Sequence, residues 1–182
     1  MSVGGLKLEK AIREFSLDFT GKIVLDIGAS TGGFTDCALR HGAALVYAID
    51  VGQNQLADSL RNHSNVISFE KMNYKDFYLD EKVDIVVMDI SFTSQKPVFS
   101  HISRWLKPGG WLISLIKPQF EMSQRMHFEH GIIKNEEIHQ MVINSVIEHA
   151  AKHQLELQKV TSAPEGVNKN KEFLAWFVFN SS

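Results

Sequence analysis

The chain has 182 residues, of which 44% are hydrophobic and 22% charged, proportions typical of one folded globular domain and not of a disordered or fibrous protein. A formal net charge of −2 excludes nucleic-acid binding by bulk charge, so an RNA partner requires a local patch or another domain. No apolar run approaches the roughly 20 residues of a membrane-spanning helix. The first residues also lack the pattern of a secretory signal, so we expect a cytoplasmic location.

Strand-like and helix-like segments alternate along the chain, which predicts an α/β fold. A leading helix is predicted over 6–15, where Leu8, Ile12 and Phe15 are spaced by four and three residues. The last two strands are expected to form a hairpin-like, antiparallel end of the sheet. The predicted strands are 22–27, 44–50, 66–69, 82–89, 111–116, 155–161 and 173–180; the further helices are 34–41, 54–61, 96–106 and 136–153, with a turn at 107–110 and a loop at 120–133.

A glycine-rich turn, Asp26-Ile27-Gly28-Ala29-Ser30-Thr31-Gly32-Gly33-Phe34, joins the first predicted strand to a helix. Glycines let a ligand approach the backbone, and open α/β sheets bind ligands beyond the carboxyl ends of their strands. The turn has neither the Gly-x-Gly-x-x-Gly dinucleotide fingerprint nor the Gly-Lys-Ser/Thr ending of a phosphate loop. Asp26, two places before the first glycine, favours a cationic ligand such as S-adenosylmethionine.

Two further polar residues follow the neighbouring strands. Asp50 ends the second strand, where its carboxylate can accept hydrogen bonds from both hydroxyls of a ribose. A strand-end aspartate is otherwise a helix cap or a solvated turn residue, but Asp26 and Asp50 flank the same glycine turn. Asn73 follows the third strand and either meets an adenine or serves only as a turn residue.

Asp89 and Lys117 end the fourth and fifth predicted strands. Adjacent parallel strands lie about 5 Å apart, so these two side chains can meet over the cofactor crevice. Partial burial or a nearby second cation lets a lysine act as a base toward a hydroxyl. The alternative interpretation is a strand-end salt bridge.

The remaining reactive side chains favour no other chemistry. Cys37, the only cysteine, lies inside a predicted helix, where a buried and inert thiol is expected. His127, His130 and His139 form no three-ligand set with metal spacing, so no metal site is expected. The sequence after Asp89 also lacks an Asn/Asp-Pro-Pro-Tyr/Phe run, which disfavours methylation of an exocyclic base nitrogen.

Together these motifs resemble the FtsJ-like methyltransferase domain of the hemolysin A family, a family of ribosomal RNA 2′-O-methyltransferases. The resemblance covers nearly the whole chain. It implies a Rossmann-like class I fold with a seven-stranded, mostly parallel sheet and an antiparallel last strand. It also implies one domain over 1–182, with a leading segment at 1–20 and the core at 21–182. The motifs that carry it are 4–11, 26–36, 48–52, 89–92 and 117–121.

The resemblance implies S-adenosylmethionine as cofactor and ribosomal RNA as partner. Family members usually carry an N-terminal RNA-binding domain, and we expect this chain to begin where the methyltransferase domain begins. The residues expected to bind the cofactor are Asp26, Gly28, Ala29, Ser30, Gly32, Gly33, Phe34, Asp50, Val51, Asn73 and Asp89.

The wider family also uses a Lys-Asp-Lys-Glu tetrad. Its matching positions here are Lys7, Asp89, Lys117 and Glu172, with Glu165 as the alternative for the last. The implied mechanism is that Lys117, next to the second cation Lys7, activates a ribose 2′-hydroxyl for attack on the sulfonium methyl. The two carboxylates would hold Lys117 in orientation.

Two other functions are weighed against RNA methylation. A membrane-active hemolysin would need an amphipathic or cationic apolar surface, which the sequence does not show. A catalytically silent module that only binds S-adenosylmethionine has the same motifs. Methyl transfer to RNA distinguishes the enzyme from the silent module, and vesicle leakage identifies the hemolysin.

Overall fold

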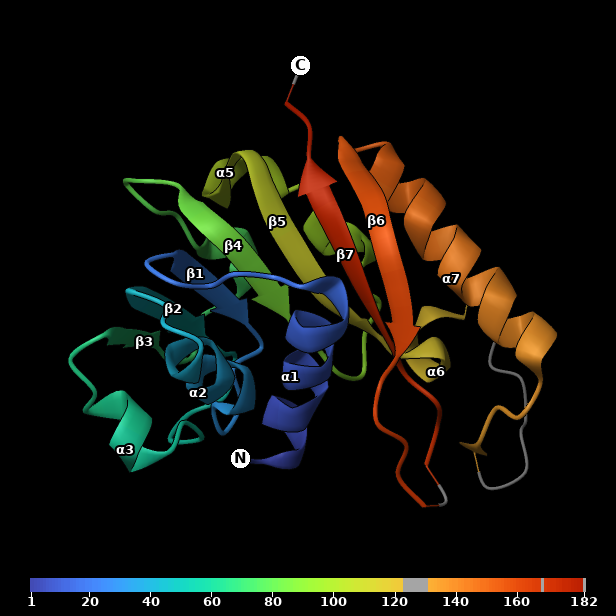
Figure 1. The fold of residues 1–182 in the computed structure, drawn as a ribbon, viewed down its shortest axis with the longest axis horizontal. Coiled ribbons are helices and arrows are strands. Elements are labelled where there is room, and N and C mark those ends of the chain that lie inside the picture. The colour runs from blue at the N-terminus through green and yellow to red at the C-terminus, as the bar shows by residue number, and fades with distance from the viewer. Residues whose placement is uncertain (123–130, 168, 182) are drawn as a thin grey trace.

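The computed structural model describes residues 1–122, 131–167 and 169–181. Within them seven strands form one sheet in the order β3-β2-β1-β4-β5-β7-β6 (Figure 1). Only β7 runs antiparallel to its neighbours, β5 and β6, which confirms the predicted mostly parallel sheet with an antiparallel last strand. The strands are β1 (Ile23–Ile27), β2 (Leu45–Ile49), β3 (Val66–Phe69), β4 (Val83–Met88), β5 (Leu106–Ile116), β6 (Leu155–Ser162) and β7 (Phe173–Phe179).

Helices cover both faces of the sheet, because the apolar side chains of its central strands alternate between two cores. In β4, Val86 and Met88 pack into one core with α5 and α7, whereas Ile85 and Val87 pack into the other with α1 and α2. The helices are α1 (Val3–Phe15), α2 (Gly33–Arg40), α3 (Asp58–Arg61), α4 (Lys96–Phe99), α5 (Ile102–Trp105), α6 (Pro118–Glu121) and α7 (Glu136–Ala151), with a 3₁₀ turn η1 (Tyr74–Asp76).

The leading helix α1 lies across α2 and beside β7 (Figure 1). Ser2 caps it, its hydroxyl accepting a hydrogen bond from the Gly5 amide at 3.1 Å. Its buried face contains the predicted Leu8, Ile12 and Phe15. The helix therefore fixes the position of the lysine at residue 7 relative to the sheet.

Three predicted elements were wrong in their extent. The helix predicted at 54–61 is only α3, because Asn54 has a left-handed backbone with φ of +56° and the N-cap residue Ala57 is still non-helical, with ψ of 139°. The helix predicted at 96–106 is divided into α4 and α5, where the Ser100 hydroxyl bonds the Pro97 carbonyl. The turn predicted at 107–110 is an irregular part of β5, whose register with β4 shifts there. The predicted loop at 120–133 lies mostly outside the described residues, and its start belongs to α6.

Candidate active site

A cavity of about 500 Å³ lies at the carboxyl edge of the sheet, where β1, β2 and β4 end. This is the edge at which open α/β sheets bind ligands. A larger hollow of about 740 Å³ lies elsewhere, between the start of α7 and residues 165–171. The smaller cavity is the candidate cofactor site, because it contains strand-end residues of the predicted set: Gly28, Ser30, Asp50, Val51, Asn73 and Asp89.

Asp50 connects the loops that follow β1 and β2. Its Oδ2 accepts a hydrogen bond from the Ser30 amide at 2.8 Å, and its Oδ1 accepts one from the Gly52 amide at 2.7 Å. Each carboxylate oxygen retains further acceptor capacity, which the two hydroxyls of a ribose can use. Asp50 is thus both a loop-ordering residue and a candidate ligand of a diol.

The turn after β1 requires unusual backbone conformations. Gly28 has φ of +78°, and a Cβ there would lie 2.2 Å from the Asp89 carbonyl oxygen. Ser30 also has a left-handed backbone, with φ of +52°. The close approach of Gly28 to the loop after β4 brings the two cavity walls together, which only glycine allows.

Asp26 lies fully buried at the end of β1. Its Oδ2 accepts a hydrogen bond from the Thr35 hydroxyl at 2.7 Å, whereas its Oδ1 has no hydrogen-bond partner among the described residues. Burial, with added repulsion from Asp89 and Asp50, raises the pKa of Asp26 to about 7. Asp26, predicted to contact the cofactor, therefore lies close to Asp50 and Asp89 but does not line the cavity, whereas those two carboxylates do.

Four predicted cofactor residues pack the turn and do not line the cavity. A Cβ at Gly32 would meet the Leu60 side chain at 2.3 Å, and one at Gly33 would lie 2.8 Å from the Gly5 amide nitrogen. Phe34 and Ala29 are buried in the hydrophobic cores. These residues shape the turn, and their contact with the cofactor stays a prediction.

Asn73 lines the cavity and also serves the turn. Its side-chain oxygen accepts a hydrogen bond from the Lys75 amide at 3.0 Å, which caps η1. Both roles that the sequence left open are therefore compatible with its position.

Lys117 follows β5 and is almost fully buried. Its Nζ lies 2.7 Å from Asp89 Oδ1 as an ion pair, but the angles there do not make a hydrogen bond. Nζ donates a hydrogen bond to Ser91 Oγ at 2.7 Å. Asp89 and Ser91 both line the cavity, so the lysine is held at its edge. Ser91 was not among the predicted site residues, because a serine after a strand is most often a turn residue.

Glu172 is the carboxylate that forms an ion pair with Lys7. Lys7 Nζ donates to Glu172 Oε1 at 2.6 Å, and both side chains are mostly buried. Glu165, the alternative, is exposed and lies 3.9 Å from Lys171 instead.

The strand register brings the two lysine–carboxylate pairs to one edge. Ile116 of β5 pairs with Phe173 of β7, so Lys117 and Glu172 each lie one residue beyond the end of this ladder. Because β7 is antiparallel, it begins where the parallel strands end. All four positions of the predicted tetrad therefore gather at this edge of the sheet.

A family model described as FtsJ-like methyltransferase matches residues 1–179. The chain belongs to the FtsJ-like methyltransferase family. It is 41% identical over 183 residues to Hemolysin A of Brachyspira hyodysenteriae, covering 98% of this chain and 76% of that protein. It is 33% identical over 180 residues to the 16S/23S rRNA (cytidine-2′-O)-methyltransferase TlyA of Mycobacterium tuberculosis, covering 97% and 67%.

A solved structure agrees with this assignment. The one named "Putative hemolysin from Streptococcus thermophilus" has a TM-score of 0.94 and 38% identity, covering 100% of this chain and 68% of that one. The family predicted from the sequence motifs is thereby confirmed. The chain spans between about two-thirds and three-quarters of these relatives. Among the described residues, no helix is both long and apolar enough to cross a membrane.

In this FtsJ-like methyltransferase, the loop that carries Asp89 and Ser91 is tied to the segment after Lys117. Glu121 of α6 accepts hydrogen bonds from the Ser94 hydroxyl at 2.5 Å and from the Gln95 amide at 2.8 Å. Burial raises the pKa of Glu121. The Gln95 side chain in turn contacts Ser114 inside β5. This network fixes the distance between the two loops that hold the lysine.

Proposed function

We propose that this chain transfers the methyl group of S-adenosylmethionine to a ribose 2′-hydroxyl of ribosomal RNA. The observation that carries the proposal is the nearly buried Lys117, held by Asp89 and Ser91 at the edge of the strand-end cavity. The name of the relative TlyA, a cytidine-2′-O-methyltransferase of 16S and 23S rRNA, supports the ribose hydroxyl as the acceptor. A ribosomal substrate also places the activity in the cytoplasm.

The cavity residues fit S-adenosylmethionine as cofactor. When bound, its sulfonium supplies an electrophilic methyl group. Asp50 has acceptor capacity for the ribose hydroxyls. Asp89 contributes a second carboxylate at the cavity and directly adjoins Lys117. We therefore assign Gly28, Ser30, Asp50, Val51, Asn73 and Asp89 to cofactor contact.

In the proposed reaction, Lys117 is the general base. Lys117 Nζ would accept the proton of the 2′-hydroxyl as the hydroxyl oxygen bonds to the methyl carbon; the carbon–sulfur bond would break and its electron pair would return to the sulfur, which leaves as a neutral thioether. The Ser91 hydroxyl and the Asp89 carboxylate restrict Nζ to one position, which makes productive orientation more frequent. Lys7 and Glu172 form a second lysine–carboxylate pair at the same edge of the sheet.

An exposed aromatic side chain beside the cavity is suited to an RNA base. Phe92 is 90% exposed, lines the cavity mouth, and has a strained left-handed backbone with φ of +66°. Its ring centroid lies 5.3 Å from that of Phe120. Proteins that recognise single-stranded RNA stack its bases on such exposed rings. We infer that Phe92 contacts the base next to the reacting ribose.

The experiment compares two lysine variants in methyl transfer. Wild type, Lys117→Ala and Lys107→Ala are incubated with methyl-labelled S-adenosylmethionine and unmethylated ribosomal particles. Lys107 is a matched control, because its Nζ lies 2.9 Å from Asp84 at the opposite end of the same two strands. We expect Lys117→Ala to lose at least about 100-fold in rate, and Lys107→Ala to keep the wild-type rate.

Calorimetric titration of the same variants with S-adenosylmethionine shows whether binding is retained. A Lys117→Ala variant that transfers methyl groups at the wild-type rate would remove Lys117 from the mechanism. Cofactor binding without any transfer by the wild type would favour the silent module. Leakage of lipid vesicles on addition of the wild type would favour the hemolysin.

A further inference from the structure

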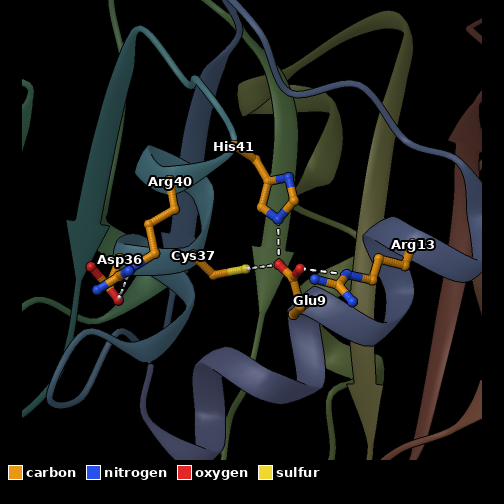
Figure 2. Close-up of polar contacts among 6 residues, drawn as sticks. All are labelled: Glu9, Arg13, Asp36, Cys37, Arg40 and His41. Atoms are coloured by element: carbon orange, nitrogen blue, oxygen red, sulfur yellow. Dashed lines mark hydrogen bonds and ion pairs between the residues drawn. The ribbon is translucent and has the colours of Figure 1, made fainter.

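Three potential metal ligands meet where α1 crosses α2, on residues that the methyl-transfer site does not use. Figure 2 shows Glu9 of α1 facing Cys37 of α2 and His41, the residue that directly follows α2. One ligand atom from each of the three lies within 4.8 Å of the other two. Cys37 and His41 are four residues apart, about one helical turn, so they can lie on the same side of the helix end. Glu9 comes from a distant part of the chain, which is why spacing along the sequence does not reveal the cluster.

The three groups converge on one oxygen atom. Cys37 Sγ lies 3.7 Å from Glu9 Oε2, and His41 Nε2 contacts the same oxygen. Arg13 binds the other oxygen, with its Nε 2.7 Å from Glu9 Oε1. Arg13 therefore orients the Glu9 carboxylate through Oε1, and Oε2 points toward the Cys37 thiol and the His41 imidazole (Figure 2).

A thiolate, an imidazole and a carboxylate together form a ligand set typical of zinc. Zinc binds sulfur at about 2.3 Å and nitrogen or oxygen at about 2.0–2.2 Å in a tetrahedron, which separates its ligand atoms by roughly 3–4 Å. The cluster needs only a small opening between Glu9 and His41 to reach these separations. We propose that Glu9, Cys37 and His41 bind one Zn²⁺ ion between α1 and α2, with water as the fourth ligand.

Solvent access agrees with this assignment. Cys37 is fully buried, but the His41 side chain is 28% exposed and leaves the cluster open to solvent on that side. On zinc binding the thiol proton is released to water, and the sulfur lone pair forms the Zn–S bond.

A zinc ion at this position would join α1 to α2. Lys7 lies two residues before Glu9 on α1, and its partner is Glu172 before β7. A metal bridge would therefore hold the helix that positions Lys7, and it would stabilise the folded chain whether or not methyl transfer occurs.

The test uses the full chain, freed of metal by a chelator and without an affinity tag. One equivalent of Co²⁺ is expected to give the near-ultraviolet absorption band of a cobalt–thiolate bond. One equivalent of Zn²⁺ is expected to abolish this band and to raise the unfolding temperature. Cys37→Ala should lose the band, and His41→Gln should bind zinc at least tenfold more weakly.

His63→Gln is the matched control. His63 is an exposed histidine outside the cluster, and its Nδ1 accepts a hydrogen bond from the Asn65 amide. It should retain the wild-type band and affinity. Cys37→Ser keeps a hydrogen-bond donor to Glu9 but no thiolate, and it replaces Cys37→Ala if that variant does not fold. A wild type without a thiolate band, or equal zinc affinity in wild type and both ligand variants, would overturn the proposal.

Discussion

Asp26→Asn removes a fully buried carboxylate whose Oδ1 has no hydrogen-bond partner among the described residues. The asparagine side-chain oxygen can still accept the 2.7 Å hydrogen bond from Thr35. In the folded protein the pKa of Asp26 is raised from 3.8 to about 7, so the folded chain holds a proton that the unfolded chain has lost. The stability of the wild type should therefore fall as the pH rises between these two values and level off above the higher one.

The magnitude follows from the pKa values. A tenfold change in a proton equilibrium is about 1.4 kcal/mol, so ionising Asp26 in the folded state costs about 4 kcal/mol in total. Asparagine does not ionise and avoids this cost. From about pH 5 to about pH 8, the stability of Asp26→Asn relative to wild type should rise by about 2–3 kcal/mol.

Urea denaturation of the two proteins at both pH values, without cofactor, measures this difference. Asp80→Asn, at an exposed position, is the control and should follow the wild type at both pH values. Calorimetry at the higher pH should show weaker binding of S-adenosylmethionine to Asp26→Asn, because one of three carboxylates at the cofactor edge is gone. A stability difference that does not change with pH would refute the electrostatic reasoning.

Three further variants test other parts of the site. Ser91→Ala removes the 2.7 Å hydrogen bond that positions Lys117 Nζ, a bond worth about 0.5–1.5 kcal/mol, so kcat should fall roughly 2- to 10-fold with unchanged affinity for S-adenosylmethionine; an unchanged kcat would show that Asp89 alone positions the lysine. Gly33→Ala places a Cβ 2.8 Å from the Gly5 nitrogen and 3.1 Å from the Gly4 carbonyl carbon, so α1 must shift and urea denaturation should show a loss of about 1–3 kcal/mol. If the Gly33→Ala variant kept the wild-type denaturation midpoint, the close packing of Gly33 against α1 would be contradicted. Phe92→Gly relieves a left-handed backbone and should gain about 1 kcal/mol in stability, while steady-state kinetics show a higher KM for RNA; an unchanged KM would rule out the contact between Phe92 and the RNA.

Much of the fold could be predicted because its signals are local. Buried strands such as 82–89 are nearly continuous in apolar residues, and the turn glycines mark where β1 ends. Asp89 and Lys117 could be paired because adjacent parallel strands bring their ends together, and the structure shows them in contact. The short length of α3 could not be predicted, since the helix begins only after the non-helical backbone at Ala57.

The finer details of the site depend on three-dimensional packing that a motif does not encode. The glycine turn did not reveal that Gly33 faces α1 while Gly28 faces the loop after β4. The choice of Glu172 over Glu165 required the position of Lys7, 165 residues away along the chain. Ser91 and the Glu9–Cys37–His41 cluster were missed for the same reason, because their partners lie on other elements.

The most direct measurement is the identity of the methylated atom. Ribosomal RNA treated with the wild type, Lys117→Ala or Lys107→Ala is digested to nucleosides, and the products are separated and identified by mass spectrometry. We predict a 2′-O-methylated nucleoside from the wild type and from Lys107→Ala, and none above background from Lys117→Ala. A methyl group on a base, or a 2′-O-methyl product that persists at the wild-type level in Lys117→Ala, would contradict a ribose hydroxyl activated by Lys117.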